Sequence, residues 1–178
     1  MIIGFKGYKQ SGKTTSAMYL CQEHGFKRAN FKDGLVSEIL DNLPDVLIQL
    51  GHVYNMKINE LFEQKPPVMR ALMQNYGTDL RRKENPDYWV KQWEEMVANL
   101  QGNIVVDDVR FKNEAEAVRK AGGIIVEVVN SDSDHIDLHV SETEGVMIEA
   151  DFTIECRKGD LECIYKNIES ILSDISAD

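Results

Sequence analysis

The sequence lacks long apolar runs and has a shortage of positive charge. Its apolar stretches span only a few residues, far short of the roughly 20 that a membrane-spanning helix needs, so we expect no membrane partner. The formal net charge is -10, and an acidic chain repels a polyphosphate backbone, so we expect no nucleic-acid polymer as partner. The first residues, MIIGFKGYKQ, show no signal-peptide pattern. These absences predict a cytoplasmic location.

Cysteine is also scarce. The three cysteines, Cys21, Cys156 and Cys163, are odd in number and lack the spacing of a zinc site. We therefore expect reduced, structural thiols, as is usual in the cytosol. The 178 residues, of which 43% are hydrophobic, suit a single globular domain with one core.

Five short apolar segments alternate with helical segments. The expected strands are residues 2–6, 26–31, 103–107, 124–129 and 151–156. Helices are expected over 12–23, in pieces over 33–63 that break near Pro44 and Gly51, from Pro66 to about Tyr76, from about Pro86 to Leu100, over 112–121 and over 160–175. Buried strands that alternate with helices predict an α/β fold with a parallel sheet of about five strands and helices on both faces.

A phosphate-binding motif lies directly after the first expected strand. The stretch GYKQSGKT places Gly7, four residues, then Gly12, Lys13 and Thr14, which matches the P-loop pattern G-x-x-x-x-G-K-[ST]. Glycines allow the backbone to approach a phosphate closely, and the loop N–H groups and the helix N-terminus then face the anion. Lys13 would contact the β- and γ-phosphates and the Thr14 hydroxyl would bind Mg²⁺. The motif predicts a nucleoside triphosphate site.

A P-loop site also needs an acidic group at the end of a neighbouring strand. Asp107 and Asp108 follow the strand NIVV, and either could hold the metal. Arg110 comes next and could bind phosphate in fork geometry, or could form a surface ion pair with Glu114.

The segment 66–93 has the composition of a second, acceptor site. GTPases read their base with an N-K-x-D element, which this sequence lacks. The segment instead combines Arg70 and Arg81 with the rings of Tyr76, Tyr88 and Trp89. Arg70 and Gln74 are four residues apart and share a helix face. This composition indicates a small-molecule kinase whose acceptor carries a phosphate and a base, although a solvated helix pair with tryptophans in the core has the same pattern.

Several motifs together resemble one family. GYKQSGKTT, NFKDGL, RALMQNYGTDLRR, NPDYWV, VVDDVRFKNEAEAVRKAGGIIVEV and HVSE are similar to segments of the phage-type deoxynucleoside monophosphate kinases, within the P-loop nucleoside monophosphate kinase fold. The resemblance covers roughly residues 2–145. It implies a single, three-layer P-loop kinase domain over 1–178, with a helical monophosphate-binding insertion at about 32–100. It also implies a bacteriophage origin and location in the host cytoplasm.

The resemblance implies transfer of the ATP γ-phosphate to a deoxynucleoside 5′-monophosphate (dNMP), with Mg²⁺ as cofactor and a dNDP and ADP as products. Matched by position, the catalytic residues would be Lys13, Asp108 and Arg110. The expected ATP-binding set is Gly7, Lys9, Ser11, Gly12, Lys13, Thr14 and Thr15, and the metal set is Thr14, Asp107 and Asp108. The expected acceptor-binding set is Phe31, Asp33, Arg70, Gln74, Gly77, Thr78, Arg81 and Trp89. His139, Ser141 and Glu142 match an H-x-S-E element without a derived role.

Two other functions fit part of the pattern. One is another P-loop small-molecule kinase, similar to dephospho-coenzyme A kinase. The other is a non-catalytic nucleotide-binding regulator, against which the arginines beside a complete P-loop argue. The accepted bases and the refusal of ribonucleotides stay open. The apolar stripe of the last helix fits either a sheet-covering helix or a homodimer contact.

Overall fold

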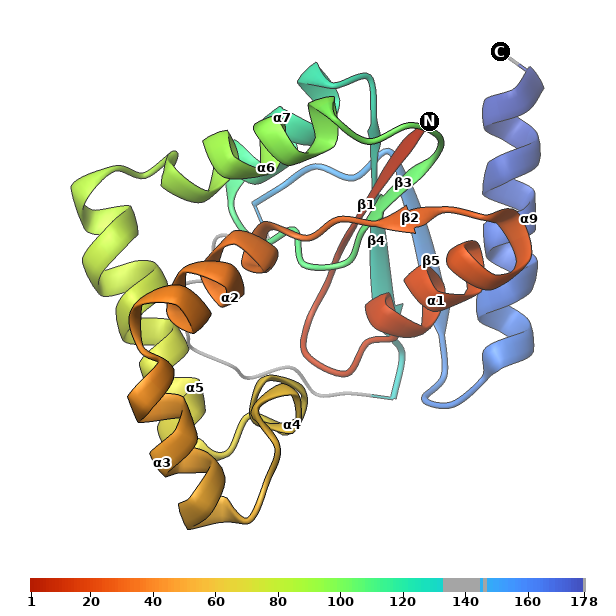
Figure 1. Cartoon of the computed structure of the whole chain (residues 1–178). Coiled ribbons are helices and arrows are strands. Elements are labelled where there is room, and N and C mark those ends of the chain that lie inside the picture. Colours follow the sequence, from red (N-terminus) through yellow and green to blue (C-terminus); the bar gives the residue numbers. More distant parts are fainter. Residues whose placement is uncertain (133–144, 146, 178) are drawn as a thin grey trace. The chain divides into compact units, whose positions relative to one another are not determined.

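The computed structural model describes residues 1–132, 145 and 147–177. The chain divides into two compact units (Figure 1). Unit 1 comprises residues 1–30 and 96–178, and unit 2 comprises residues 31–95. Unit 2 overlaps the segment at about 32–100, whose role as an insertion in a single domain stays a prediction.

Unit 1 contains a five-stranded sheet in the order β2-β3-β1-β4-β5. The strands are β1 (Ile2–Lys6), β2 (Lys27–Arg28), β3 (Ile104–Val106), β4 (Ile124–Asn130) and β5 (Phe152–Cys156). Every pair of neighbours is parallel. The prediction of a parallel sheet of about five strands is confirmed. Strand β2 is much shorter than the expected 26–31, because only Lys27 and Arg28 pair with β3 and α2 begins at Phe31.

Helices cover both faces of this sheet. Ile3 and Phe5 point to the face that packs against Leu20 of α1 (Lys13–His24) and Ile168 of α9 (Leu161–Ala177). Gly4 points to the opposite face, where a Cβ would lie 3.3 Å from Val118 of α7 (Lys112–Lys120). Successive residues of a strand alternate between faces, so the apolar run of β1 is buried on both sides. The three-layer arrangement predicted from the sequence is confirmed (Figure 1).

Unit 2 is helical and has a core of its own. Its elements are α2 (Phe31–Asn42), α3 (Pro44–Tyr54), α4 (Ile58–Gln64), α5 (Pro67–Gln74), the π-helix η1 (Asn75–Arg82) and α6 (Tyr88–Ala98), whose last turn belongs to unit 1. The fully buried core side chains include Ile39, Leu47, Leu61 and Met69.

One expected helix break in unit 2 is correct and one is wrong. The break near Pro44 is confirmed, because Pro44 opens α3. Gly51 instead lies buried inside α3, which ends only where Asn55 adopts a left-handed conformation. The core of unit 2 therefore overrides the low helix propensity of this glycine.

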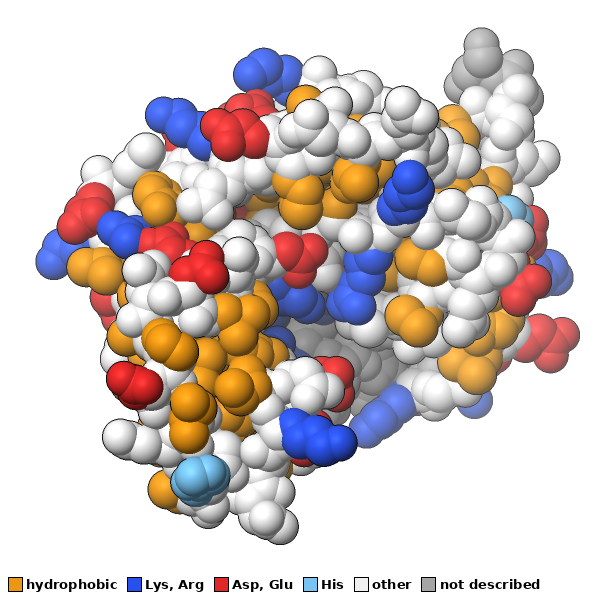
Figure 2. All heavy atoms as spheres, viewed as in Figure 1, with side chains coloured by type: hydrophobic (Ala, Val, Ile, Leu, Met, Phe, Trp, Pro, Cys, Tyr) orange, Lys and Arg blue, Asp and Glu red, His pale blue; other side chains and the backbone are white. Residues whose placement is uncertain are grey.

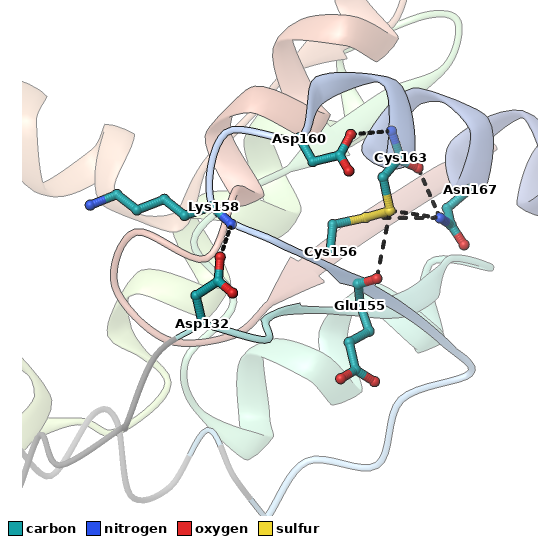
Figure 3. Close-up of a disulfide and its surroundings, with 7 residues drawn as sticks. All are labelled: Asp132, Glu155, Cys156, Lys158, Asp160, Cys163 and Asn167. Atoms are coloured by element: carbon teal, nitrogen blue, oxygen red, sulfur yellow. Dashed lines mark hydrogen bonds between the residues drawn. A yellow bond between two sulfur atoms is a disulfide. The ribbon is translucent and has the colours of Figure 1, made fainter.

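The expectation of three reduced cysteines is wrong for two of them. Cys156, at the end of β5, forms a disulfide with Cys163 in the first turn of α9 (Figure 3). The turn between the strand and the helix reverses the chain, so that the two Cα atoms lie 6.0 Å apart, within the usual range for a disulfide. Cys21 is a free thiol, and burial raises its pKa.

The surface of unit 2 carries hydrophobic side chains, coloured orange in Figure 2. Val46, Ile48, Val53 and Val68 are exposed. Exposed apolar residues are normal on protein surfaces, so their presence alone indicates no site. Among the described residues, no helix combines the length and the apolar character needed to cross a membrane.

Candidate functional site

The loop between β1 and α1 has a backbone that only glycine adopts easily. Gly7 has φ +138° and Gly12 has φ +111°. A Cβ on Gly7 would lie 2.2 Å from the Val128 carbonyl oxygen, so the loop is packed directly against β4. The strand, glycine loop and helix follow one another as the P-loop motif predicts.

The polar groups of this loop suit a bound phosphate chain. The Lys13 ammonium donates to the carbonyls of Gly7 and Tyr8, both at 2.6 Å, and so folds over the loop. Within the described part of the chain no side chain caps the N-terminus of α1, and the first turn of α1 contains no acidic residue. The buried Ser11 hydroxyl has no hydrogen-bond partner among the described residues. An unpartnered buried hydroxyl and an uncapped helix N-terminus both suit a phosphate oxygen.

The remaining expected ATP-binding residues flank this loop. Lys9 is exposed near its tip, Thr14 is exposed in the first turn of α1, and Thr15 is half-buried. The Ser16 hydroxyl donates to the Gly12 carbonyl and thereby holds the start of the helix.

Asp107 is a buried partner of an arginine. Nε of Arg28 donates to Oδ1 at 3.2 Å and Nη2 to Oδ2 at 2.7 Å. The Asp107 N–H donates to the side-chain oxygen of Asn30 at 2.9 Å. Both carboxylate oxygens therefore bind the guanidinium, and the pair joins the ends of β2 and β3. This geometry favours Asp108, which is half-buried, over Asp107 as the metal candidate.

Glu114 fixes the loop that carries Asp108 and Arg110. Its buried carboxylate accepts the backbone N–H groups of Arg110, at 2.7 Å, and Phe111, at 3.1 Å. Glu114 therefore acts as the acidic member of a capping arrangement at the start of α7. Because β1 and β3 are parallel neighbours, this loop and the P-loop emerge at the same edge of the sheet.

Lys6, the last residue of β1, is a buried cation. Its ammonium donates to the carbonyls of Ile148, at 2.6 Å, and Gly145, at 3.3 Å, and lies 3.1 Å from the Glu127 carboxylate. Lys6 thus ties the segment before β5 to the strand that enters the P-loop.

Unit 2 holds all the expected acceptor-binding residues. Arg70 and Gln74 are exposed on α5, and Asp33 lies in the first turn of α2. Phe31 is buried against the Trp93 ring, with a centroid distance of 4.8 Å. Thr78 is half-buried in η1.

Trp89 lies in the core of unit 2 and is only 2% exposed. Its indole N–H donates to the Gly77 carbonyl at 3.0 Å. A Cβ on Gly77 would lie 3.1 Å from Leu35, so Gly77 allows α2 and η1 to pack closely. In this structure Trp89 supports the backbone of η1 from the core, and direct contact between Trp89 and an acceptor stays a prediction.

Arg81 forms part of a polar group that we call the Glu38 cluster: Glu38, Tyr76, Arg81 and Tyr88. Arg81 donates from Nη2 to Oε1 of Glu38. This hydrogen bond to Glu38 raises the pKa of Arg81. Burial, together with the Glu38 hydrogen bond, raises the pKa of Tyr88.

Sequence reasoning missed five residues that organise these sites: Lys6, Arg28, Asn30, Glu38 and Glu114. The sequence suggested Glu114 only as an ion-pair partner of Arg110. Its place three residues after Phe111 is the N3 position of a capping box and could have indicated a capping role. The other four meet partners far along the chain, and no local signal marks them. His139, Ser141 and Glu142 lie outside the described residues.

A parallel sheet, a glycine loop between β1 and α1, a lysine folded over that loop and an acidic strand end beside it define the class of P-loop nucleotide-binding proteins. The model of the family "Deoxynucleotide monophosphate kinase" matches residues 40–168. The chain belongs to the deoxynucleotide monophosphate kinase family.

Two viral proteins with similar sequences are named deoxynucleotide monophosphate kinases. A protein of Acanthamoeba polyphaga mimivirus, provisionally named as a deoxynucleotide monophosphate kinase, is 27% identical over 99% of this chain and 98% of its own length. The deoxynucleotide monophosphate kinase of Escherichia phage RB69 is 34% identical over 58% of this chain and 44% of its own length.

Solved structures also show similarity. Shikimate kinase from Aquifex aeolicus aligns with a TM-score of 0.49 and 15% identity over 99% of this chain and 96% of that chain. TT1252 from Thermus thermophilus aligns with a TM-score of 0.49 and 16% identity over 98% of this chain and 97% of that chain.

Proposed function

We propose that this kinase uses ATP as phosphate donor and transfers its γ-phosphate to a dNMP, giving a dNDP and ADP. The P-loop carries this proposal, because its unpartnered Ser11 hydroxyl and its lysine match the needs of a triphosphate. Family membership supports the choice of a deoxynucleotide acceptor.

The P-loop residues would bind and orient the donor. The backbone N–H groups from Gly7 to Thr14 surround the phosphates, and Ser11 donates its hydroxyl to one of their oxygens. Lys13 exchanges the two loop carbonyls that it now contacts for β- and γ-phosphate oxygens. Positive charge at this position stabilises the charge that spreads over the transferred group.

Thr14 and Asp108 would hold Mg²⁺ at the edge of the sheet where the P-loop and the β3 loop emerge. When bound, Mg²⁺ neutralises phosphate charge and orients the leaving oxygens. Arg110 would contact the transferred phosphoryl group, and Glu114 holds the backbone of Arg110 in place. The acceptor is already a phosphate dianion and needs no strong general base, so in-line positioning provides most of the catalysis.

Unit 2 would bind the acceptor. Arg70 and Gln74, exposed one turn apart on α5, form the candidate contact with the monophosphate. Asp33, Gly77, Thr78 and Arg81 complete the proposed acceptor-binding surface.

A substrate panel tests the proposal. Purified protein with ATP and Mg²⁺ is incubated with each of the four dNMPs, with dephospho-coenzyme A and without acceptor, and products are separated by chromatography. We expect at least one dNDP in amounts equal to the ADP formed. Phosphorylation of dephospho-coenzyme A alone, or ADP formation that no acceptor stimulates, would refute the proposal. Lys13→Ala should abolish turnover, whereas Lys27→Ala, an exposed lysine of β2, should not.

A further inference from the structure

The carboxylate of Glu38 gathers polar groups from two other elements of unit 2. The Tyr76 hydroxyl donates to Oε1 at 3.2 Å, the Tyr88 hydroxyl donates to Oε2 at 3.0 Å, and Arg81 donates to Oε1. Glu38 lies on α2, Tyr76 and Arg81 on η1, and Tyr88 on α6. One carboxylate of α2 thus fixes side chains of η1 and α6.

The unusual geometry of η1 makes this grouping possible. Tyr76 and Arg81 are five residues apart, a spacing that an α-helix of 3.6 residues per turn would separate by about 140° around its axis. A π-helix has i→i+5 hydrogen bonds and more residues in each turn than an α-helix, so it brings residues five apart closer to the same side. The π-helix over Asn75–Arg82 therefore brings both side chains to Glu38, and such segments occur frequently at functional sites.

The charge of Arg81 is already balanced. Its guanidinium pairs with Glu38 and lies 3.8 Å from the Glu84 carboxylate. It also lies over the rings of Tyr76 and Tyr88, at 5.6 Å and 5.2 Å from their centroids. A phosphate dianion would gain little from an arginine in this setting and would meet the repulsion of two carboxylates. The Glu38 cluster is therefore poorly suited to hold the monophosphate itself.

The cluster suits the nucleoside part of an acceptor better. A carboxylate offers about four acceptor positions, and Tyr76, Arg81 and Tyr88 use three of those on Glu38. The cluster reaches the surface of unit 2, because the side chains of Glu38 and Arg81 are 13% and 28% exposed. The remaining acceptor position of Glu38, on a side chain that is 13% exposed and lies beside two phenol groups, would match the N–H donors on the edge of a nucleobase.

We propose that Glu38 is a specificity-determining residue that helps to select the base of the dNMP, with Tyr76, Arg81 and Tyr88 holding it in position. This inference rests on the proposed dNMP kinase function. It assigns Arg81 to base selection through Glu38, whereas Arg70, which the structure leaves exposed on α5, contacts the phosphate that all dNMPs share.

The test compares kcat/KM for the four dNMPs in the wild type and in Glu38→Gln, Tyr88→Phe and Arg70→Ala. Glu38→Gln should lower kcat/KM at least tenfold for the best dNMP and less than threefold for the poorest, so that the ratio between them shrinks. Tyr88→Phe removes only the hydroxyl bonded to Oε2 and should shrink the ratio in the same direction. Arg70→Ala should lower kcat/KM by a similar factor for all four.

A uniform loss in Glu38→Gln, or no loss, would overturn the inference, as would a wild type that uses all four dNMPs equally well. If circular dichroism shows that Glu38→Gln does not fold, the test rests on Tyr88→Phe alone, through its ratio of kcat/KM between the best and the poorest dNMP. A wild type that phosphorylates no dNMP refutes the proposed function and the inference with it, and this outcome is visible before any variant is measured.

Discussion

Replacing Asp107 by asparagine should mainly affect stability, whereas the same change at Asp108 should mainly affect catalysis. Asn has nearly the size of Asp but removes the charge that Arg28 binds at both oxygens. The Asp107 side chain is 1% exposed and that of Arg28 is 32% exposed. The pair is therefore buried on its acidic side only.

The cost follows from this asymmetry. Removing one partner of a buried ion pair costs about 3–5 kcal/mol. Arg28 can turn partly into water and asparagine still offers one acceptor oxygen, so we expect a loss of about 2–4 kcal/mol. In a chain of this size each kcal/mol shifts the melting temperature by about 2–4 °C, which gives a shift of roughly 5–15 °C.

Two assays separate the roles of the two residues. Urea denaturation gives the free energy of unfolding of both variants, and ADP formation over a range of Mg²⁺ concentrations gives the metal requirement of the folded enzyme. Asp108→Asn should keep its stability within about 1 kcal/mol, in the range of most substitutions outside the core, and should raise the Mg²⁺ concentration needed for turnover. A stable Asp107→Asn variant with a raised Mg²⁺ requirement would refute this reasoning.

Three further predictions concern other contacts. Glu114→Ala leaves two backbone N–H groups without their carboxylate. It should lower the free energy of unfolding by about 2–4 kcal/mol and slow turnover, as urea denaturation and ADP formation would show. Glu114→Gln should have a smaller effect on both quantities. Cys156→Ser removes the disulfide with Cys163, which closes a loop with a sequence separation of 7. Without reductant the variant should have a free energy of unfolding about 2.5 kcal/mol below that of the wild type. The same difference between variant and wild type in dithiothreitol would contradict this prediction. The hydrogen bond to Glu169 raises the pKa of Tyr19 from 10.0 to about 12. This hydrogen bond therefore stabilises the folded protein below pH 10, and the stabilisation is lost as the pH rises toward 12. Tyr19→Phe should reduce the fall of the melting temperature across that pH range relative to the wild type, as thermal melts of both proteins would show.

The sequence contained enough local information for the sheet and the phosphate loop. Strands β1, β3 and β4 are short apolar runs. The P-loop needs glycine because its backbone takes angles such as φ +138° at Gly7, which are set within the loop itself. Pro44 also marks a helix start by a local effect, since proline suits the first turn. Features of this kind depend on neighbours in the chain and are therefore predictable.

The supporting contacts depend on distant residues and were not predictable. Asp107 meets Arg28 across 79 positions of sequence, and Glu38 meets Arg81 across 43. The odd cysteine count suggested reduced thiols, whereas a tight turn between β5 and α9 brings two of the three together. The hydrogen bond from the Trp89 N–H to the Gly77 carbonyl within the core was likewise not predictable, and the role of Trp89 as a ring for the acceptor stays a prediction.

Phosphoryl transfer between two nucleotides is the central claim, and radiolabel transfer tests it most directly. Protein is mixed with ATP labelled at the γ-phosphate, Mg²⁺ and the best dNMP of the panel, and the products are separated by thin-layer chromatography. We predict that the label moves to the β-position of the dNDP, at a rate that matches ADP formation and vanishes in Lys13→Ala. Label that appears only as inorganic phosphate, or that stays on ATP, would contradict the account.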